Sequence, residues 1–179
     1  RAPLTTTRWL DTAGLLFGLA ALTRPDGVLL GVAAFGGALL TRPSRRLLRP
    51  AILFLVLTGG HLIFRWLYYG ELLPNTYHAK VGGRAWWSMG GRYDALFVLE
   101  YAVFLFIPLV VAAWRGHRQN ATAHRSAIIA AIILPHFAYV TAIGGDHFEF
   151  RPFDLYFPLL FIMMYDGAKA IAASRGPTA

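Results

Sequence analysis

The sequence lacks cysteine and is poor in charged residues. Without cysteine, the chain has no disulfide, no thiolate metal site and no cysteine nucleophile, and redox chemistry leaves its compartment undetermined. Charged residues make up 15% of the 179 residues, whereas a soluble globular domain carries about 25%. The hydrophobic share is 56% and the mean hydropathy is +0.50. Several long apolar runs account for these values, so the sequence predicts an integral membrane protein.

Acidic residues are also scarce, with 9 Asp and Glu against 17 Lys and Arg. A positive excess can indicate nucleic-acid binding. Here, however, the arginines are concentrated in short loops between apolar runs, where they set membrane topology. We therefore expect membrane lipids, and no nucleic acid, as partners. The scattered histidines predict no metal site.

The apolar runs predict an all-α fold, a polytopic transmembrane helical bundle that forms one membrane domain over residues 1–179. Two short helices, 9–22 and 28–40, should meet in a hairpin, because each is too short to cross a core of about 30 Å. Pro25 should open the second helix, where its missing N–H costs little. Four full spans are expected, at residues 51–69, 94–114, 126–143 and 155–173.

Alternation of these spans across a membrane sorts the polar segments onto two sides. Eleven of the seventeen Lys and Arg fall in four segments that we predict to be cytoplasmic: 1–8, 41–50, 115–125 and the region from Lys169 onward. The opposite, extracytoplasmic side of the cell membrane then receives residues 23–27, 65–84 and 144–154. This coincidence predicts that the three polar segments share one outward-facing pocket.

The first of these segments, residues 23–27 (Thr-Arg-Pro-Asp-Gly), interrupts a stretch that is otherwise suited to lipid. Arg24 and Asp26 must be paired, buried in protein or exposed to a water-filled cavity. They either cap the helix ends in a tight turn or line the polar pocket and bind substrate.

The second segment, 65–84, begins as apolar helix and ends as a polar loop. Gly70 should stop the helix, and Pro74 should direct the exit. Arginine grips phosphate with a bidentate fork and lysine acts as a point charge, while Asn and Tyr bond to hydroxyls. The predicted ligand-binding residues are Arg65, Tyr69, Asn75, Tyr77, Lys80 and Arg84. In the alternative interpretation this segment is an interfacial loop whose tyrosines and tryptophans anchor it in the membrane.

The third segment, 144–154, begins directly after a span with two glycines that allow a close approach of backbone to ligand. Asp146 either pairs with Arg151 or acts as the catalytic carboxylate, which orients or deprotonates a substrate hydroxyl or holds a divalent cation. We assign His147 and Arg151 to substrate binding. No metal-ligand set and no organic cofactor are predicted.

Together the segments resemble those of polytopic GT-C glycosyltransferases. The matching residues are Leu-Thr-Arg-Pro-Asp-Gly at 22–27, Tyr-Tyr-Gly-Glu-Leu-Leu-Pro-Asn-Thr-Tyr-His-Ala-Lys at 68–80, and Gly-Gly-Asp-His-Phe-Glu-Phe-Arg at 144–151. The nearest subgroup includes the bacterial terminal β-(1→2)-arabinofuranosyltransferases of cell walls. This resemblance implies a polyprenyl-phosphate sugar donor, an extracytoplasmic active site, and a glycan, lipid or protein acceptor.

One departure from that family concerns catalysis. The family's usual catalytic acids lie in a first large extracytoplasmic loop near the N-terminus, and no such loop precedes the first helix here. The chain begins at Arg1 without a signal-peptide pattern, so we expect it to be part of a longer protein and to be inactive alone. Asp146 is the best local substitute for the missing base.

Two other functions compete with sugar transfer. A transporter or flippase of a lipid-linked anion would also need cations and broken helices, but in two corresponding halves. The sequence shows one hairpin and no second copy. A non-catalytic subunit of a membrane assembly is the other alternative.

Overall fold

The computed structural model describes residues 4–82, 84–116 and 121–174, and within these ranges every regular element is a helix. The all-α prediction is therefore confirmed. The chain forms two compact units, Arg1–Gly83 and Arg84–Ala179, which are described separately here. The single membrane domain expected from the sequence stays a prediction.

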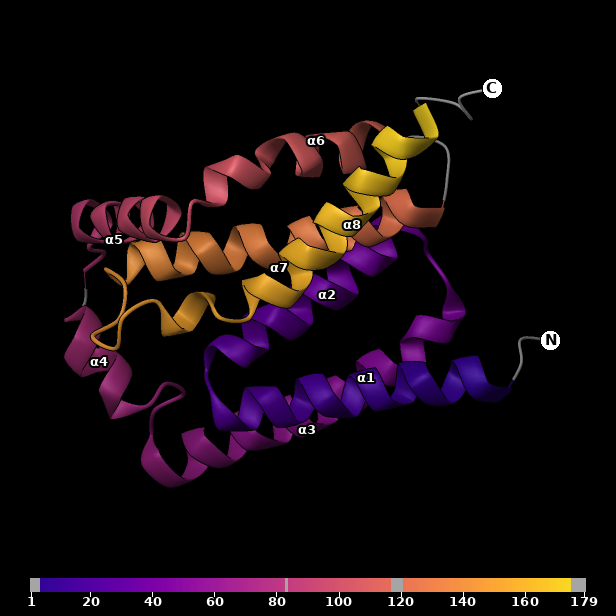
Figure 1. Cartoon of the computed structure of the whole chain (residues 1–179). Coiled ribbons are helices and arrows are strands. Elements are labelled where there is room, and N and C mark those ends of the chain that lie inside the picture. The colour runs from indigo at the N-terminus through magenta and orange to yellow at the C-terminus, as the bar shows by residue number, and fades with distance from the viewer. Residues whose placement is uncertain (1–3, 83, 117–120, 175–179) are drawn as a thin grey trace. The chain divides into compact units, whose positions relative to one another are not determined.

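The first unit is a three-helix bundle followed by a short helix (Figure 1). Its elements are α1 (Leu4–Thr23), α2 (Asp26–Thr41), the 3-10 turn η1 (Arg45–Leu47), α3 (Leu48–Tyr69) and α4 (Asn75–Val81). The start of α1 lies beside the start of α3, and the two helices run in the same direction with α2 returning between their ends. The helix α3 ends at Gly70, whose φ of 72° gives the left-handed cap that glycine adopts without strain.

Close packing in this bundle depends on small residues. A Cβ atom on Gly14 of α1 would lie 2.3 Å from the carbonyl oxygen of Pro50 on α3. One on Gly31 of α2 would lie 2.3 Å from the ring of Phe54. Helices in lipid associate through such close contacts, because lipid provides no hydrophobic force between them.

The predicted hairpin of residues 9–40 is present, with Pro25 (φ −58°) immediately before α2. The helix α1, however, has 20 residues and begins at Leu4. Hydropathy located only the apolar part of this helix, since the polar first turns carry Arg8 and Asp11 and have no lipid-like pattern.

The second unit contains α5 (Trp87–Glu100), η2 (Val103–Phe106), α6 (Ile107–Gly116), α7 (Ala121–Ala142), η3 (Arg151–Phe153) and α8 (Tyr156–Ser174). The start of α5 packs on the end of α7, and α8 runs back along α7. The predicted span 94–114 is not straight: the helices on either side of Ala102 meet at a bend of 65°. Ala102 has a φ of 49°, a left-handed conformation that ends α5.

Three helical stretches are long and apolar enough to cross a membrane: Arg45–Tyr69, Arg125–Ala142 and Tyr156–Ser174. The bent pair on either side of Ala102 would make a fourth if it acts as one broken span. These lengths and compositions agree with the predicted polytopic bundle.

Aromatic side chains form the core of the second unit. The buried cluster consists of Phe97, Val140, Phe150, Phe153 and Tyr156. It joins α5 and α7 to the segment that precedes α8. The loop after α7, which carries Asp146, is therefore anchored on this aromatic core.

Candidate functional site

The first unit contains a pocket of about 760 Å³ at the end where α1 stops, α2 starts and α3 stops. Three kinds of segment surround it: helix ends, the turn before α2, and the loop that leads into α4. The lining residues are Ala21, Leu22, Thr23, Pro25, Val28, His61, Leu62, Arg65, Trp66, Gly70, Glu71, Leu72, Leu73, Pro74 and His78. Two of the three predicted polar segments, 23–27 and 65–84, therefore meet at one pocket.

Arg65 is the cation in the pocket wall. Its Nε donates a hydrogen bond of 2.9 Å to the carbonyl oxygen of Leu72, and its guanidinium carbon lies 5.5 Å from the centre of the Tyr69 ring. These contacts hold the guanidinium plane while its two terminal nitrogens have no acceptor among the residues that the structure describes. A guanidinium held in this way presents a fork suited to phosphate.

The lining also contains three further titratable side chains, those of His61, Glu71 and His78. Nε2 of His78 lies 3.7 Å from Oε2 of Glu71, and both side chains are more than half exposed. His61 comes four residues before Arg65 on α3, so the two residues share a helix face. The remaining wall is mainly aliphatic and aromatic, so the pocket combines an apolar surface with a polar rim.

Arg24 and Asp26 form a bidentate ion pair in the turn before α2. The arginine Nε lies 3.0 Å from Asp26 Oδ1, and Nη2 lies 2.7 Å from Oδ2. Asp26 is 7% exposed, whereas the Arg24 side chain is 47% exposed. The neighbouring Thr23 and Pro25 line the pocket, but the two charged residues do not. The turn-stabilising alternative thus describes their geometry, and their role in substrate binding stays a prediction.

Three other predicted residues, Tyr69, Asn75 and Tyr77, are not among the residues that line the pocket. Tyr69 is 60% exposed, Asn75 opens α4, and the ring of Tyr77 packs on that of His78 at 5.7 Å between centroids. The backbone of Lys80 belongs to α4, and its side chain lies outside the described part of the chain. Their assignment to substrate binding remains a prediction.

Two residues of the pocket wall, His61 and Glu71, are not predicted from the sequence as site residues. His61 was interpretable only as a residue inside a span, and Glu71 as a charge in a loop. The spacing of four residues between His61 and Arg65 is the signal that could have placed the histidine on the pocket face.

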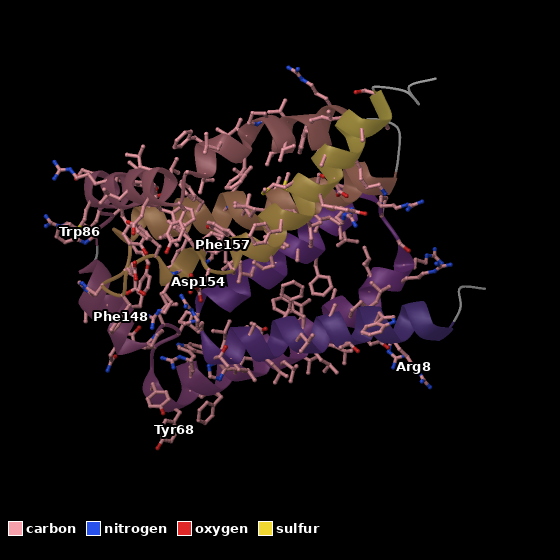
Figure 2. The ribbon with its side chains drawn as sticks, viewed as in Figure 1. Arg8, Tyr68, Trp86, Phe148, Asp154 and Phe157 are labelled. Atoms are coloured by element: carbon pink, nitrogen blue, oxygen red, sulfur yellow. The ribbon has the colours of Figure 1, made fainter. Side chains whose placement is uncertain are left out.

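In the second unit, Asp146 is the centre of a small hydrogen-bonded loop. Its Oδ2 accepts from Arg151 at 2.9 Å and its Oδ1 accepts from the backbone N–H of His147 at 2.8 Å. The Asp146 side chain is 5% exposed and that of Arg151 is 52% exposed. The guanidinium of Arg151 also lies 4.8 Å from the centre of the Phe148 ring, and Figure 2 shows Phe148 on this loop. Of the two alternatives for Asp146, the ion pair with Arg151 is present in the structure, and the catalytic role stays a prediction.

The two glycines before Asp146 are required by the backbone. Gly144 and Gly145 have φ values of 84° and 88°. A Cβ on Gly145 would lie 2.5 Å from the ring of Tyr93, whose hydroxyl donates to the carbonyl oxygen of Glu149. The Tyr93 ring therefore lies against Gly145, and a close approach of this backbone to a ligand stays a prediction.

Arg84, the remaining predicted substrate residue, also belongs to the second unit. Its guanidinium carbon lies 3.9 Å from the centre of the Trp86 ring, a cation–π contact. This geometry fits an interfacial anchor, and phosphate binding by Arg84 stays a prediction.

A buried carboxylate that the sequence analysis missed lies on α5. Asp94 is 7% exposed, and its Oδ2 accepts from the Thr141 hydroxyl at 2.6 Å. Its Oδ1 is buried and has no hydrogen-bond partner among the residues that the structure describes. In the described ranges, no group of three or more His, Asp or Glu side chains is arranged to hold a metal ion.

Comparison with known proteins gives two relatives of the same kind. The chain is 32% identical over 165 residues to a terminal β-(1→2)-arabinofuranosyltransferase of Corynebacterium glutamicum. This alignment covers 82% of the chain and 24% of the relative. It is 31% identical over 137 residues to the protein of that name in Mycobacterium tuberculosis. That alignment covers 74% of this chain and 21% of the relative. The chain thus spans about a quarter of the length of these relatives. No protein-family model matches the chain. No solved structure matches it either.

Proposed function

We propose that this chain, which is related in sequence to the terminal β-(1→2)-arabinofuranosyltransferases, forms part of a membrane glycosyltransferase of the cell envelope. The relationship over 82% of the chain is the observation that carries this proposal. The apolar helices support it, because at least three of them are long and apolar enough to cross a membrane.

The proposed donor is a polyprenyl-phosphate sugar, and its proposed site is the pocket of the first unit. The apolar wall formed by side chains such as Leu62 and Trp66 suits the lipid near its phosphate. Arg65 suits the phosphate itself, since its terminal nitrogens are free of other acceptors in the described part of the chain. An amphiphilic ligand matches both kinds of surface.

The proposed reaction is transfer of one sugar to a hydroxyl group of a glycan, lipid or protein on the extracytoplasmic side of the cell membrane. The acceptor oxygen forms a bond to the anomeric carbon, and the bond from that carbon to the phosphate oxygen breaks with its electron pair leaving on the phosphate. A cation beside the phosphate stabilises this developing charge. The hydroxyl proton passes to a carboxylate base.

Asp146 is the proposed base within this chain. Hydrogen bonds from Arg151 and from the backbone N–H of His147 hold the carboxylate in one orientation.

The test is a transfer assay with the full-length protein in proteoliposomes that contain radiolabelled polyprenyl-phosphate sugar and an acceptor. We expect label on the acceptor. Label that crosses the bilayer while it remains on the donor lipid would instead support a flippase. Absence of both outcomes, with partner proteins restoring transfer, would support a non-catalytic subunit.

A further inference from the structure

The end of the first unit opposite the pocket carries a group of arginines. We call this the basic end, and it comprises Arg8 on α1, Arg42 directly after α2, Arg45 and Arg46 in η1, and Arg49 in the first turn of α3. Figure 2 shows Arg8 near the start of α1 and Tyr68 near the end of α3, at opposite ends of this unit. The basic end is therefore separate from the proposed donor site.

Few acids balance these cations. Residues 1–70 contain two acidic residues, Asp11 and Asp26. Asp26 pairs with Arg24 at the pocket end, and Asp11 pairs with Arg49 at 3.2 Å. The exposed side chains of Arg42, Arg45 and Arg46 have no carboxylate within salt-bridge distance in the described ranges.

The backbone that carries these three arginines is ordered by its own sequence. The Ser44 hydroxyl accepts a hydrogen bond of 3.3 Å from the backbone N–H of Arg46 and so caps the 3-10 turn Arg45–Leu47. Pro43 and Pro50 restrict the backbone on either side of this turn. An ordered backbone lowers the entropy lost when a ligand binds.

Exposed apolar side chains lie beside the arginines in the sequence. Leu40 is 88% exposed at the end of α2, Leu48 is 54% exposed at the start of α3, and Trp9 is 75% exposed near the start of α1. Tryptophan is enriched at the level of lipid headgroups. Cations next to exposed apolar groups fit a ligand that has both an anionic headgroup and acyl chains.

We propose that the basic end is a binding site for anionic phospholipids, with Arg42, Arg45 and Arg46 on the headgroup phosphate and Leu40 and Leu48 on the acyl chains. Each cation near a membrane surface contributes roughly a five-fold gain in affinity for anionic lipid, so three contribute roughly 100-fold. This site does not depend on the proposed sugar transfer.

The experiment measures lipid binding to the purified full-length protein in a neutral detergent. Phosphatidylglycerol and phosphatidylcholine are titrated separately, and bound lipid is counted by native mass spectrometry. We expect tighter binding of phosphatidylglycerol, and a roughly 100-fold loss of this preference in the R42Q/R45Q/R46Q variant. The R42K/R45K/R46K variant keeps the charge and should retain most of the preference.

The matched control is R92Q/R115Q, which removes two exposed arginines outside the first unit and should leave the preference unchanged. A second measurement on the unmodified protein avoids any folding defect: high salt should abolish the preference because it screens exposed charges. The proposal is overturned if the R42Q/R45Q/R46Q variant, or the unmodified protein at high salt, keeps the preference. It is also overturned if inorganic phosphate displaces phosphatidylglycerol at equal concentration, because the site would then select a free anion.

Discussion

Arg65 shows how a single residue in an apolar helix is adapted to a charged ligand. Its Nε is bound to the Leu72 carbonyl and its plane lies near the Tyr69 ring, so the guanidinium stays at the pocket instead of turning away. The cost of a cation in a membrane helix is offset by this placement at a polar rim.

If the pocket binds the lipid-phosphate donor, Arg65→Gln should raise the donor KM of the full-length enzyme about 10-fold or more, because a hydrogen bond to a charged group contributes about 1.5–3 kcal/mol. The kcat should change less, since the lost contact already exists in the ground state. Steady-state kinetics with varied donor would measure both. Arg92→Gln, an exposed cation elsewhere, is the control, and an equal KM in both variants would remove Arg65 from the site.

Gly145 is a second residue that its backbone conformation and its neighbours require to be glycine. Its φ is 88°, and a Cβ atom built on it would clash with the Tyr93 ring, so there is no room for a side chain. Gly145→Ala should lower the free energy of unfolding by at least about 1–2 kcal/mol because of the left-handed backbone alone. Chemical denaturation in detergent would measure the loss.

Gly91→Ala is the matched control for that substitution. Gly91 lies in α5 with no atom within 4 Å of a built Cβ, so alanine should raise stability by about 0.5–1 kcal/mol. Equal stability of the two variants would contradict the tight contact between Gly145 and Tyr93.

Among the elements, α1 and α3 are held together by backbone approach rather than by large side chains. Gly14→Ala would place a methyl group 2.3 Å from the Pro50 carbonyl oxygen, and backbone cannot swing aside as a side chain does. We expect a loss of about 1–3 kcal/mol, the usual penalty of overpacking. Gly36→Ala on α2 meets no atom within 4 Å and should be neutral or stabilising. Thermal unfolding of both variants would be compared, and a Gly14→Ala protein as stable as Gly36→Ala would disprove this packing.

The break between α5 and α6 is another property of elements. Hydropathy predicts one span at 94–114, because apolar residues continue through the bend at Ala102. A change of backbone direction leaves no trace in hydropathy. Position 102 is an alanine, and the proline of this span, Pro108, lies in the first turn of α6 beyond the bend, so it marks a break nearby without placing it at Ala102.

For the whole molecule, the proposed topology can be tested by cysteine labelling in intact cells, since the chain has no cysteine of its own. A cysteine at His78 or His147 should react with a membrane-impermeant thiol reagent, and one at Arg46 should react only after the membrane is permeabilised. Arginine-rich loops stay in the cytoplasm, and this is the reason for the expected difference. The reverse pattern would invert the arrangement and exclude an extracytoplasmic donor site.

The sequence by itself determined the membrane class, the helical fold and the C-terminal ends of α1, α2, α3, α7 and α8 to within one residue, because apolar runs, glycine and proline are local signals. It also predicted that segments 23–27 and 65–84 meet at one pocket. It did not predict α4, which lies in a segment expected to be a loop. Only the tertiary structure decided which side chains take part: Arg24 turns to Asp26, Arg151 turns to Asp146, and Arg65 faces the pocket. A charged side chain has several candidate partners along a sequence, and the path of the folded backbone selects one of them, even when the partner is only two residues away, as for Arg24 and Asp26, or five, as for Arg151 and Asp146.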